Sequence, residues 1–427
     1  MKKCLISLAC YLASFNLFGQ ITPEYGVHWA NALVDISGQE LRKGADSLKA
    51  HNIKWLRVYF EWNKIQPTDS QWDWGTIDAK TDSLVNNGFH IIGTFINTPQ
   101  WASSNPDTVN YPQLSKRYPP KDTADWKNYI DSVVSRYHHQ IEHWEVWNEP
   151  NAGIYFITEN IIDKPYIYYT LLKIAYNTVK NIDTSNKVLI GGLTTETFIK
   201  EKSILFLDSI FKLGAFNYYD IMNLHLYQNI AGLKQGYDSL YNAWEINKKP
   251  VWITETNNAL ALRPENSEQN SANNICSWLK DSIIACFNPE VICWFYMQNW
   301  ARDSIFGVPC DTCDTNKTFF GLFDTDYEPT LLLDEFAHCD FTTTAYPSVK
   351  NNGQFHIFPN PAKNTVNIFG NNLEQIEIYN IYGHRVFIKQ YNQVNQVKID
   401  ISRLSGRIYF IKTRSANNIS VVQIVKH

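Results

Sequence analysis

The sequence is poor in two features that mark large classes of proteins. Beyond the N-terminal segment it has no hydrophobic run long enough to cross a bilayer, so we expect the mature chain to be soluble. Its central part also lacks a positive net charge: residues 1–20 carry +2 and residues 351–427 carry +6, so the total of −4 leaves −12 for residues 21–350. Because nucleic acid binds to basic surfaces, this charge argues against nucleic acid as a partner.

Residues 1–20 have the layout of a secretory signal peptide. Lys2 and Lys3 precede the apolar stretch Cys4–Ala13, and the segment ends near Gln20. A basic start followed by a short apolar core predicts cleavage near Gln20 and export of the mature chain. The alternative is an additional N-terminal helix of the fold.

Cysteine is also scarce. Two of the eight cysteines fall in the N-terminal segment, and the other six are Cys276, Cys286, Cys293, Cys310, Cys313 and Cys339. An even number in an exported protein favours disulfides, and Cys310 and Cys313 are spaced to close a small loop. A zinc site is the rival interpretation, but no second closely spaced Cys or His pair accompanies it. The pairing of the other four stays open, including a buried free thiol at Cys293.

Between residues 21 and 345, short apolar strands alternate with amphipathic helical stretches, which is typical of βα units with parallel strands. The predicted strands are Tyr25–His28, Trp55–Phe60, His90–Phe95, His143–Trp147, Val188–Gly192, Ile221–Leu226, Val251–Thr254 and Val291–Tyr296. Eight such units favour an α/β fold, a closed (β/α)8 TIM barrel. The rival, a doubly wound sheet, would place a glycine-rich turn after the first strand, and no glycine cluster follows there.

The chain changes character near Ala345–Gly353. All 14 tryptophans lie before residue 345, while asparagine becomes frequent after it and the apolar segments become short. Six short strands between Asn and Gly turns predict a separate small antiparallel β-sandwich over residues 346–427.

The motif His143–Pro150 carries the strongest functional signal. An apolar, aromatic-rich strand ends at Pro150, which lacks the N–H that a sheet needs, so Glu149 lies at a strand tip. Pro150 also predicts an extended backbone at Glu149, and the end of regular pairing would let Asn148 and Glu149 face one cavity. Taken alone, Glu149 could equally cap the following helix.

A second glutamate, Glu255, ends the seventh predicted strand. Three units around a closed barrel would place Glu149 and Glu255 across one central cavity. Such a pair suits glycoside hydrolysis, with one group as acid/base and the other as nucleophile or as base for water. A separation of about 5–5.5 Å would mean retention of configuration and a larger one inversion, which a sequence does not measure. Each glutamate singly also fits a cap or an ion pair.

Other predicted strand ends carry polar and aromatic side chains. Arg57 could hold a carboxylate in its ionised form, and Tyr227 could donate to the same group. Trp294 offers an apolar face to a sugar ring. Each of these also fits a core or surface position, and Arg57 is the strongest because an unpaired arginine inside a barrel would be costly. Other candidate residues at the predicted strand ends include His28, Trp101 and His225.

These motifs resemble the retaining glycoside hydrolases of clan A, and within the clan families 39 and 5 most. The resemblance covers about residues 24–336 and rests on Tyr118-Pro119-Pro120, Trp126, Tyr137, Trp144–Pro150, Leu224-His225-Leu226-Tyr227 and Trp252-Ile253-Thr254-Glu255. It implies a double displacement with Glu149 as acid/base and Glu255 as nucleophile. It further implies Asn148 on the sugar 2-hydroxyl, with support from Arg57, His225, Tyr227 and Trp294, and more weakly from His28 and Trp101. The segment Gln298–Cys313 matches the pattern of no single specificity, so the sugar stays open.

The tail has a resemblance of its own. Phe358-Pro359-Asn360-Pro361, Ile378-Tyr379-Asn380 with Gly383, and Gly406-Arg407-Ile408-Tyr409 resemble the C-terminal sorting domain of the type IX secretion system of Bacteroidota. This implies export across the outer membrane, with release or attachment to the cell surface. A carbohydrate-binding module is the rival, and the lack of tryptophan in the tail disfavours it.

The sequence therefore predicts a secreted retaining glycosidase that acts on a polysaccharide or oligosaccharide without a cofactor or metal. A non-catalytic surface glycan-binding protein on a barrel scaffold is the main alternative. A metal-dependent hydrolase is a third, and no His/Asp cluster is evident at the strand tips. The linkage, endo or exo action and the oligomeric state stay open.

Overall fold

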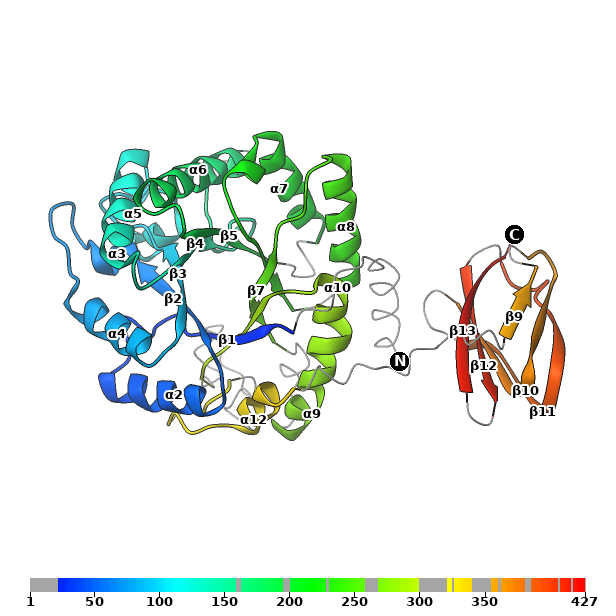
Figure 1. The fold of residues 1–427 in the computed structure, drawn as a ribbon. Helices are drawn as coiled ribbons and strands as arrows, with labels where there is room; N and C mark the ends of the chain where they lie inside the picture. Colours follow the sequence, from blue (N-terminus) through cyan, green and yellow to red (C-terminus); the bar gives the residue numbers. More distant parts are fainter. Residues whose placement is uncertain are drawn as a thin grey trace. The chain divides into compact units, whose positions relative to one another are not determined.

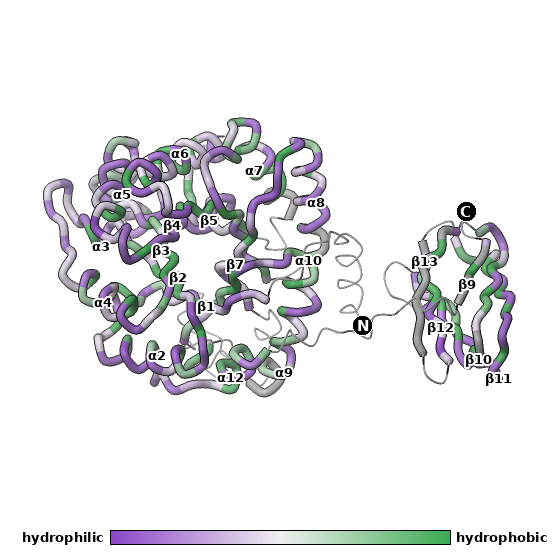
Figure 2. The backbone as a smooth tube through the Cα atoms, in the orientation of Figure 1, coloured by the Kyte–Doolittle hydropathy of each residue, from purple (hydrophilic) through white to green (hydrophobic). Residues whose placement is uncertain are grey.

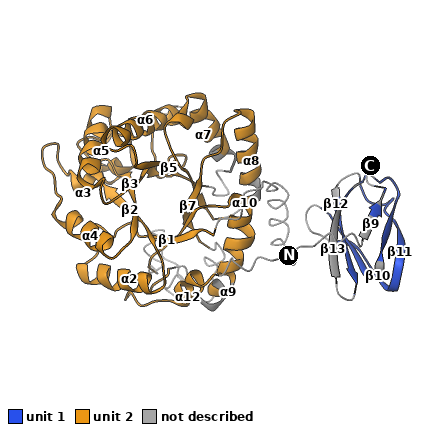
Figure 3. Ribbon diagram, in the orientation of Figure 1, with its two compact units in different colours: residues 1–15, 340–427 blue, residues 16–339 orange. Residues whose placement is uncertain are grey.

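The structure is a computed structural model of the 427-residue chain. It describes residues 22–158, 163–194, 200–227, 230–257, 268–298, 321–324, 326–339, 355–359, 362–380, 385–405, 408–415 and 418–426. The described residues up to Cys339 form one compact unit and those from residue 355 onwards form another (Figure 3). The predicted signal peptide and the predicted boundary at residues 345 and 346 lie outside the described residues.

Eight parallel strands close into a barrel in sequence order, which confirms the predicted TIM barrel (Figure 1). Each strand pairs with its neighbours along the chain, and β1 pairs with β8 to close the ring. The strands are β1 Glu24–His28, β2 Trp55–Glu61, β3 His90–Ile96, β4 His143–Asn148, β5 Lys187–Thr194, β6 Met222–Leu226, β7 Val251–Thr256 and β8 Val291–Trp294. All eight predicted strands are present, with ends displaced by at most a few residues.

Amphipathic helices surround the barrel, and hydrophilic and hydrophobic segments alternate along them in Figure 2. Local signals set their starts: Ser37 and Glu40 form a capping box at α2, and Asp122 caps α5. The helices are α2 Gly38–Ala50, α3 Trp62–Ile65, α4 Gly75–Asn86, α5 Thr123–Tyr137, α6 Lys164–Ile182, α7 Lys200–Lys212, α8 Ile230–Ala243, α9 Glu268–Trp278, α10 Ala285–Phe287 and α12 Leu331–Ala337. None of the described helices is both long and apolar enough to cross a membrane.

The barrel interior is built in layers, because alternate residues of a strand point inward. We call the first set the apolar layer; it consists of Trp55, Ile92, Leu189, Ile221, Trp252, Val291 and Cys293. Buried hydrophilic side chains lie two positions further along on β2, β3, β6 and β7, and also on β4. We call these the polar layer; it consists of Arg57, Thr94, Glu145, Asn223 and Thr254. The polar layer lies next to the strand-end residues, one step earlier along the barrel strands.

A disulfide joins Cys276 in α9 to Cys339, just after α12. Cys293 is a buried free thiol, which was one of the alternatives for it. Cys286 is also disulfide-bonded. The predicted loop closed by Cys310 and Cys313 lies outside the described residues.

The C-terminal unit is all-β and antiparallel, as predicted. Its five described strands form one sheet in the order β11-β10-β12-β13, with β9 also on β10. The long strands β10 and β11 pair through several register shifts, and a core including Val366, Ile376, Ile399 and Ile411 lies within the unit. The strands are β9 Phe355–Phe358, β10 Thr365–Asn380, β11 Arg385–Asp400, β12 Ile408–Ser415 and β13 Asn418–Val425.

Candidate active site

A cavity of about 430 Å³ opens at the carboxyl ends of the barrel strands. Parallel strands bring these ends to one edge, so residues far apart in the sequence meet there. Among its lining residues are His28, Tyr59, Asn148, Glu149, Glu255 and Phe295. Asn148 and Glu149 thus share one cavity although they are sequence neighbours.

Arg57 is the hub of the polar network. It is fully buried and donates two hydrogen bonds to Glu145, of 2.5 and 3.0 Å. It also donates to Glu255 Oε1 at 2.7 Å and to Asn148 Oδ1 at 2.9 Å. The pKa of Arg57 is held well above its ordinary value because Glu145 and the other surrounding anions outweigh the effect of burial. Arg57 therefore stays a cation that orders Glu145, Glu255 and Asn148 together.

Glu145, four residues before Glu149, is a buried structural carboxylate. Besides Arg57, it accepts hydrogen bonds from Thr94, from the Gly192 backbone and from the Asn223 amide, between 2.8 and 2.9 Å. It has no exposed surface. A carboxylate satisfied in this way positions its neighbours and is shielded from substrate.

The backbone at Glu149 differs from the prediction. Pro150 favours an extended residue before it, yet the φ of Glu149 is 44°, in the left-handed region, and that of Trp147 is 70°. Non-glycine residues adopt such angles rarely, and they gather at functional sites where the surrounding structure holds them. The ordered neighbours of the strand end override the local preference that Pro150 imposes.

Glu149 and Glu255 both approach the same ring nitrogen of His225. His225 Nδ1 is 2.8 Å from Glu149 Oε1 and 3.4 Å from Glu255 Oε2. One oxygen from each carboxylate and one nitrogen of His225 all lie within 4.8 Å of one another. The carboxylates of the two glutamates therefore lie close together in the same cavity.

Glu255 is held by two donors, as the sequence suggested for a charged nucleophile. Arg57 donates to Oε1, and the Tyr227 hydroxyl donates to Oε2 at 2.5 Å. Burial raises the pKa of Glu255 to about 7, although Arg57 and Tyr227 oppose this rise. The carboxyl group is therefore poised to change its charge near neutral pH.

His28 closes the site from β1. Its Nδ1 accepts a hydrogen bond of 2.8 Å from Arg57, and its Nε2 lies 3.8 Å from Glu255 Oε1. Burial and the adjacent Arg57 cation hold the pKa of His28 well below its ordinary value. His28 is thus a neutral polar wall of the cavity.

Five predicted site residues do not line this cavity. Arg57, His225 and Tyr227 still bond to glutamates that do line it, whereas Trp294 and Trp101 contact other parts of the barrel. Trp294 is fully buried and packs on Phe336 of α12 at 5.6 Å between ring centroids, because on β8 Cys293 points inward and the next residue therefore points outward. Trp101 donates to the backbone oxygen of Gln66 and packs edge-on against Trp62. The predicted role of Trp294 as a sugar floor is wrong.

The aromatic wall is supplied instead by Phe295, which the sequence interpretation missed. Its ring stacks on His28 with 5.4 Å between centroids and meets Tyr227 edge-on at 5.8 Å. A strict period of two counted from the buried Cys293 would have pointed to Phe295 instead of the adjacent tryptophan. Tyr59 of β2 and Lys116 also line the cavity and were missed.

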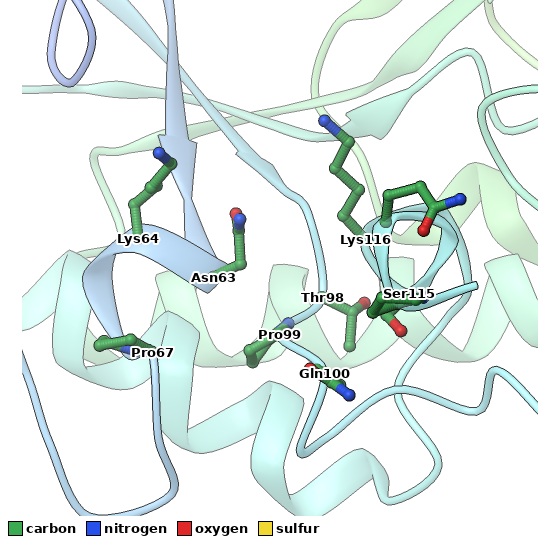
Figure 4. Close-up of a pocket in the computed structure, with 10 residues that line it drawn as sticks. Asn63, Lys64, Pro67, Thr98, Pro99, Gln100, Ser115 and Lys116 are labelled. Atoms are coloured by element: carbon green, nitrogen blue, oxygen red, sulfur yellow. The ribbon is translucent and has the colours of Figure 1, made fainter. Parts of the chain in front are cut away.

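A second cavity of about 420 Å³ adjoins the first. Lys116 lines both, and Asn97 of the first cavity precedes Thr98 of the second. In Figure 4 the side chains of Lys64, Asn63 and Lys116 lie along one side, opposite Pro67, Pro99 and Gln100. The hollow at the strand ends therefore extends beyond the glutamate pair.

The group of Glu149, His225 and Glu255 has the spacing of metal ligands. A cation there would compete with Arg57, which already lies 2.7 Å from Glu255. Because like charges repel strongly in a buried site, the resident guanidinium disfavours a metal ion at this position.

Comparisons with known proteins show that the chain is similar to glycoside hydrolases. A profile described as "Glycosyl hydrolase family 10" matches residues 57–215, and one described as "Glycosyl hydrolase catalytic core" matches residues 176–306. Glu149 falls in the first range and Glu255 in the second. A third profile, "Secretion system C-terminal sorting domain", matches residues 356–427. No curated protein sequence matches the chain.

Among solved structures, the fold is similar to a family 39 glycoside hydrolase from Bacteroides cellulosilyticus (TM-score 0.52, 14% identity, 95% of this chain and 81% of that chain covered). It is also similar to a family 39 β-xylosidase from Caulobacter crescentus (TM-score 0.53, 14% identity, 96% of both chains). A glucosidase from Croceicoccus marinus is a third (TM-score 0.51, 11% identity, 96% of both chains). At such identities these likenesses concern the fold alone.

Proposed function

We propose that this chain, a glycosidase with a secretion-system sorting domain at its C-terminus, hydrolyses O-glycosidic bonds with retention of configuration by double displacement. The observation that carries the mechanism is the short gap between the carboxylates: one oxygen of Glu149 and one of Glu255 lie within 4.8 Å. Retaining enzymes need the nucleophile close to the anomeric carbon, whereas inverting enzymes need room for a water molecule between the carboxyl groups.

The surroundings of the two glutamates support different roles. Arg57 and Tyr227 both donate to Glu255, so its anion is stabilised and its oxygens are oriented for attack. Glu149 Oε1 lies 2.8 Å from Nδ1 of His225, whose pKa is held well below its ordinary value by burial and by Arg57. We therefore assign Glu255 as nucleophile and Glu149 as acid/base.

The first half-reaction joins Glu255 to the anomeric carbon while Glu149 donates its proton to the leaving oxygen. In the second, Glu149 takes a proton from water, whose oxygen attacks the anomeric carbon and releases Glu255. Because Arg57 holds Asn148 Oδ1, the Asn148 amide nitrogen is directed to donate to a sugar hydroxyl beside the reacting carbon. Phe295 provides the apolar face against which a sugar ring can pack.

The substrate class that fits is a glycan of more than one sugar unit. The catalytic cavity and the adjoining cavity share Lys116 and together offer room for linked sugars. Their linings combine polar side chains with apolar surface, which suits both the hydroxyl groups and the ring faces of sugars. An exported location follows from the sorting domain, and we propose release or attachment at the cell surface after cleavage of residues 1–20.

The decisive experiment combines analysis of the product with substitution of each glutamate by glutamine. The full chain is screened against a polysaccharide and oligosaccharide panel, and the anomer first formed is identified by NMR. We expect the retained anomer, and losses on the order of 10⁴-fold or more in Glu149→Gln and Glu255→Gln.

Azide separates the two roles. It should restore Glu255→Ala and give a glycosyl azide of inverted configuration, because azide attacks from the face that the nucleophile vacated. Full activity in either Gln variant would refute the assignment. Glycan binding without release of reducing ends would instead identify a glycan-binding protein, and activity abolished by a chelator would identify a metal-dependent hydrolase.

A further inference from the structure

We propose that Asn223 and Thr254 are positioning residues that dictate where the proton lies in the Glu149–His225 pair and keep Glu149 in its acid form before each turnover. The inference concerns buried side chains that touch neither cavity. It rests on the proposed function, because it explains how Glu149 is prepared as an acid.

The chain of hydrogen bonds begins at Glu145. Asn223 Nδ2 lies 2.8 Å from Glu145 Oε1, an oxygen that also accepts from Arg57 and from the Gly192 backbone. A carboxylate paired with a guanidinium only accepts, so it must meet the amide nitrogen of Asn223. The orientation of the amide follows, and its oxygen points to Thr254.

Asn223 Oδ1 in turn fixes the Thr254 hydroxyl. The Thr254 oxygen lies 2.8 Å from it, and the Thr254 backbone N–H points to the same atom at 3.3 Å. Since an amide oxygen only accepts, the single hydroxyl proton must lie between the two oxygens. The Thr254 hydroxyl then has only lone pairs to offer to its other neighbour.

That neighbour is His225, whose Nε2 lies 3.1 Å from Thr254 Oγ1. Nε2 must therefore carry a proton and donate it. A neutral imidazole has one N–H, so Nδ1 is an acceptor, and Glu149 Oε1 at 2.8 Å must be the donor. The orientation of one amide, three side chains away, thus requires a protonated Glu149.

Packing holds the ring in this geometry. A Cβ atom added at Gly192 would lie 2.0 Å from His225 Nε2, so the imidazole rests directly on the Gly192 backbone. Only glycine permits this approach. The ring is thereby held where Nε2 meets Thr254 and Nδ1 meets Glu149.

The surrounding charges favour a neutral imidazole. The titratable groups that face the pair are His28 on β1, Arg57 on β2, Tyr227 after β6, Glu255 on β7 and Tyr296 after β8. Burial and, next, the Arg57 cation hold the pKa of His225 well below its ordinary value. An imidazolium is thus disfavoured, and the shared proton belongs to Glu149.

The relay also serves the second half-reaction. Once Glu149 has given its proton to the leaving oxygen, its carboxylate and the Nδ1 lone pair are two acceptors facing each other without a hydrogen. This repulsion makes Glu149 a stronger base, which takes the proton of the attacking water and restores the starting state. No proton is gained or lost over the cycle.

The test is ¹⁵N NMR of the full chain labelled at histidine, which reports ring protonation without any substrate. The His225 signal is assigned by its loss in His225→Gln. We expect the neutral Nε2–H form in the wild type. In Thr254→Val, Nε2 loses its acceptor, and the proton should move to Nδ1, facing an ionised Glu149. Thr254→Ser should keep the wild-type form, as should Thr94→Val, which removes another hydroxyl bonded to Glu145.

A pH profile gives the second readout, with a 4-nitrophenyl glycoside that the enzyme hydrolyses. In Thr254→Val the Nδ1–H stabilises the Glu149 anion, so the alkaline limb of kcat/KM should fall by about one to two pH units, and in Thr94→Val it should not move. An Nδ1–H or an imidazolium signal in the wild type would overturn the proposal, as would an unchanged tautomer in folded Thr254→Val. Because the NMR result does not depend on turnover, it separates this proposal from the proposed function.

Discussion

The apolar and polar layers of the barrel are built by the same strands, two residues apart, yet their roles differ: one packs the barrel and the other orients polar side chains. On β2, Trp55 belongs to the first and Arg57 to the second, and on β7 the same holds for Trp252 and Thr254. Trp55 and Trp252 meet edge-on across the barrel with 4.8 Å between ring centroids. Arg57, by contrast, donates hydrogen bonds to two carboxylates, to an amide oxygen and to the His28 ring.

The energetics of the two layers differ accordingly. Each large apolar side chain contributes about 1.5–3 kcal/mol by leaving water. A buried ion pair such as Arg57 with Glu145 recovers its desolvation cost only when its hydrogen bonds are complete. The apolar layer thus stabilises the barrel, whereas the polar layer holds charges in place for the residues above it.

The largest expected effect comes from two separate variants, one that disrupts the polar layer and one that disrupts the apolar layer. Arg57→Met leaves two buried carboxylates without their cation and should lower the free energy of unfolding by about 3–5 kcal/mol at pH 7.5. Leu189→Ala, in the apolar layer, should cost about 2–5 kcal/mol. Urea unfolding followed by tryptophan fluorescence measures the barrel alone, because all 14 tryptophans lie before residue 345.

The pH dependence distinguishes the two variants. Without Arg57, the pKa of Glu255, already raised by burial to about 7, rises further. A carboxyl group whose pKa is raised by folding destabilises the protein as pH increases from its unfolded value towards its folded value. The loss in Arg57→Met should therefore shrink at pH 5.5, and the loss in Leu189→Ala should be the same at both pH values. Equal pH dependence would contradict the division into layers.

A smaller effect tests the inward and outward faces of β8. Phe295→Leu removes the ring that faces the cavity and should raise KM by about 2- to 12-fold, the equivalent of ~0.5–1.5 kcal/mol for an aromatic contact. Trp294→Phe should lower stability and leave KM unchanged, because Trp294 packs on Phe336. A rise in KM confined to Trp294→Phe would restore the tryptophan as the sugar floor.

The smallest effect concerns the charge of Glu255. The Tyr227 hydroxyl donates to the ionised carboxylate and so lowers its pKa. Tyr227→Phe should raise that pKa, and the acidic limb of kcat/KM should move to higher pH by about one unit. Tyr241→Phe, which removes a hydroxyl bonded to Tyr219 away from the site, serves as the control. A shift to lower pH, or equal shifts in the two variants, would argue against this role.

Much of the fold and part of the site were accessible from residue patterns. Strand and helix periodicity predicted the eight strands because burial imposes that periodicity on each segment by itself. Glu149 and Glu255 were singled out because a barrel brings all strand ends to one edge. These inferences need only local patterns and one topological rule.

What the patterns missed depends on contacts between strands. Trp294 and Phe295 are adjacent aromatic residues, and only the register of β8 decides which of them faces the cavity. The left-handed backbone of Glu149 opposes the preference imposed by Pro150 and is held by its surroundings. Asn223 stands in no recognised motif, and Thr254 enters one only as the neighbour of Glu255, because the importance of both lies in contacts with atoms from other strands.

The sequence by itself determined the barrel, the all-β tail and the two glutamates at matching strand ends, since hydrophobic periodicity and strand order are properties of the chain taken one segment at a time. Only the tertiary structure decided that the carboxylates lie within 4.8 Å of each other, that Phe295 forms the wall, and that a relay from Glu145 reaches His225. These features depend on which side chains from different strands meet. That is determined only when the strands have paired in one register.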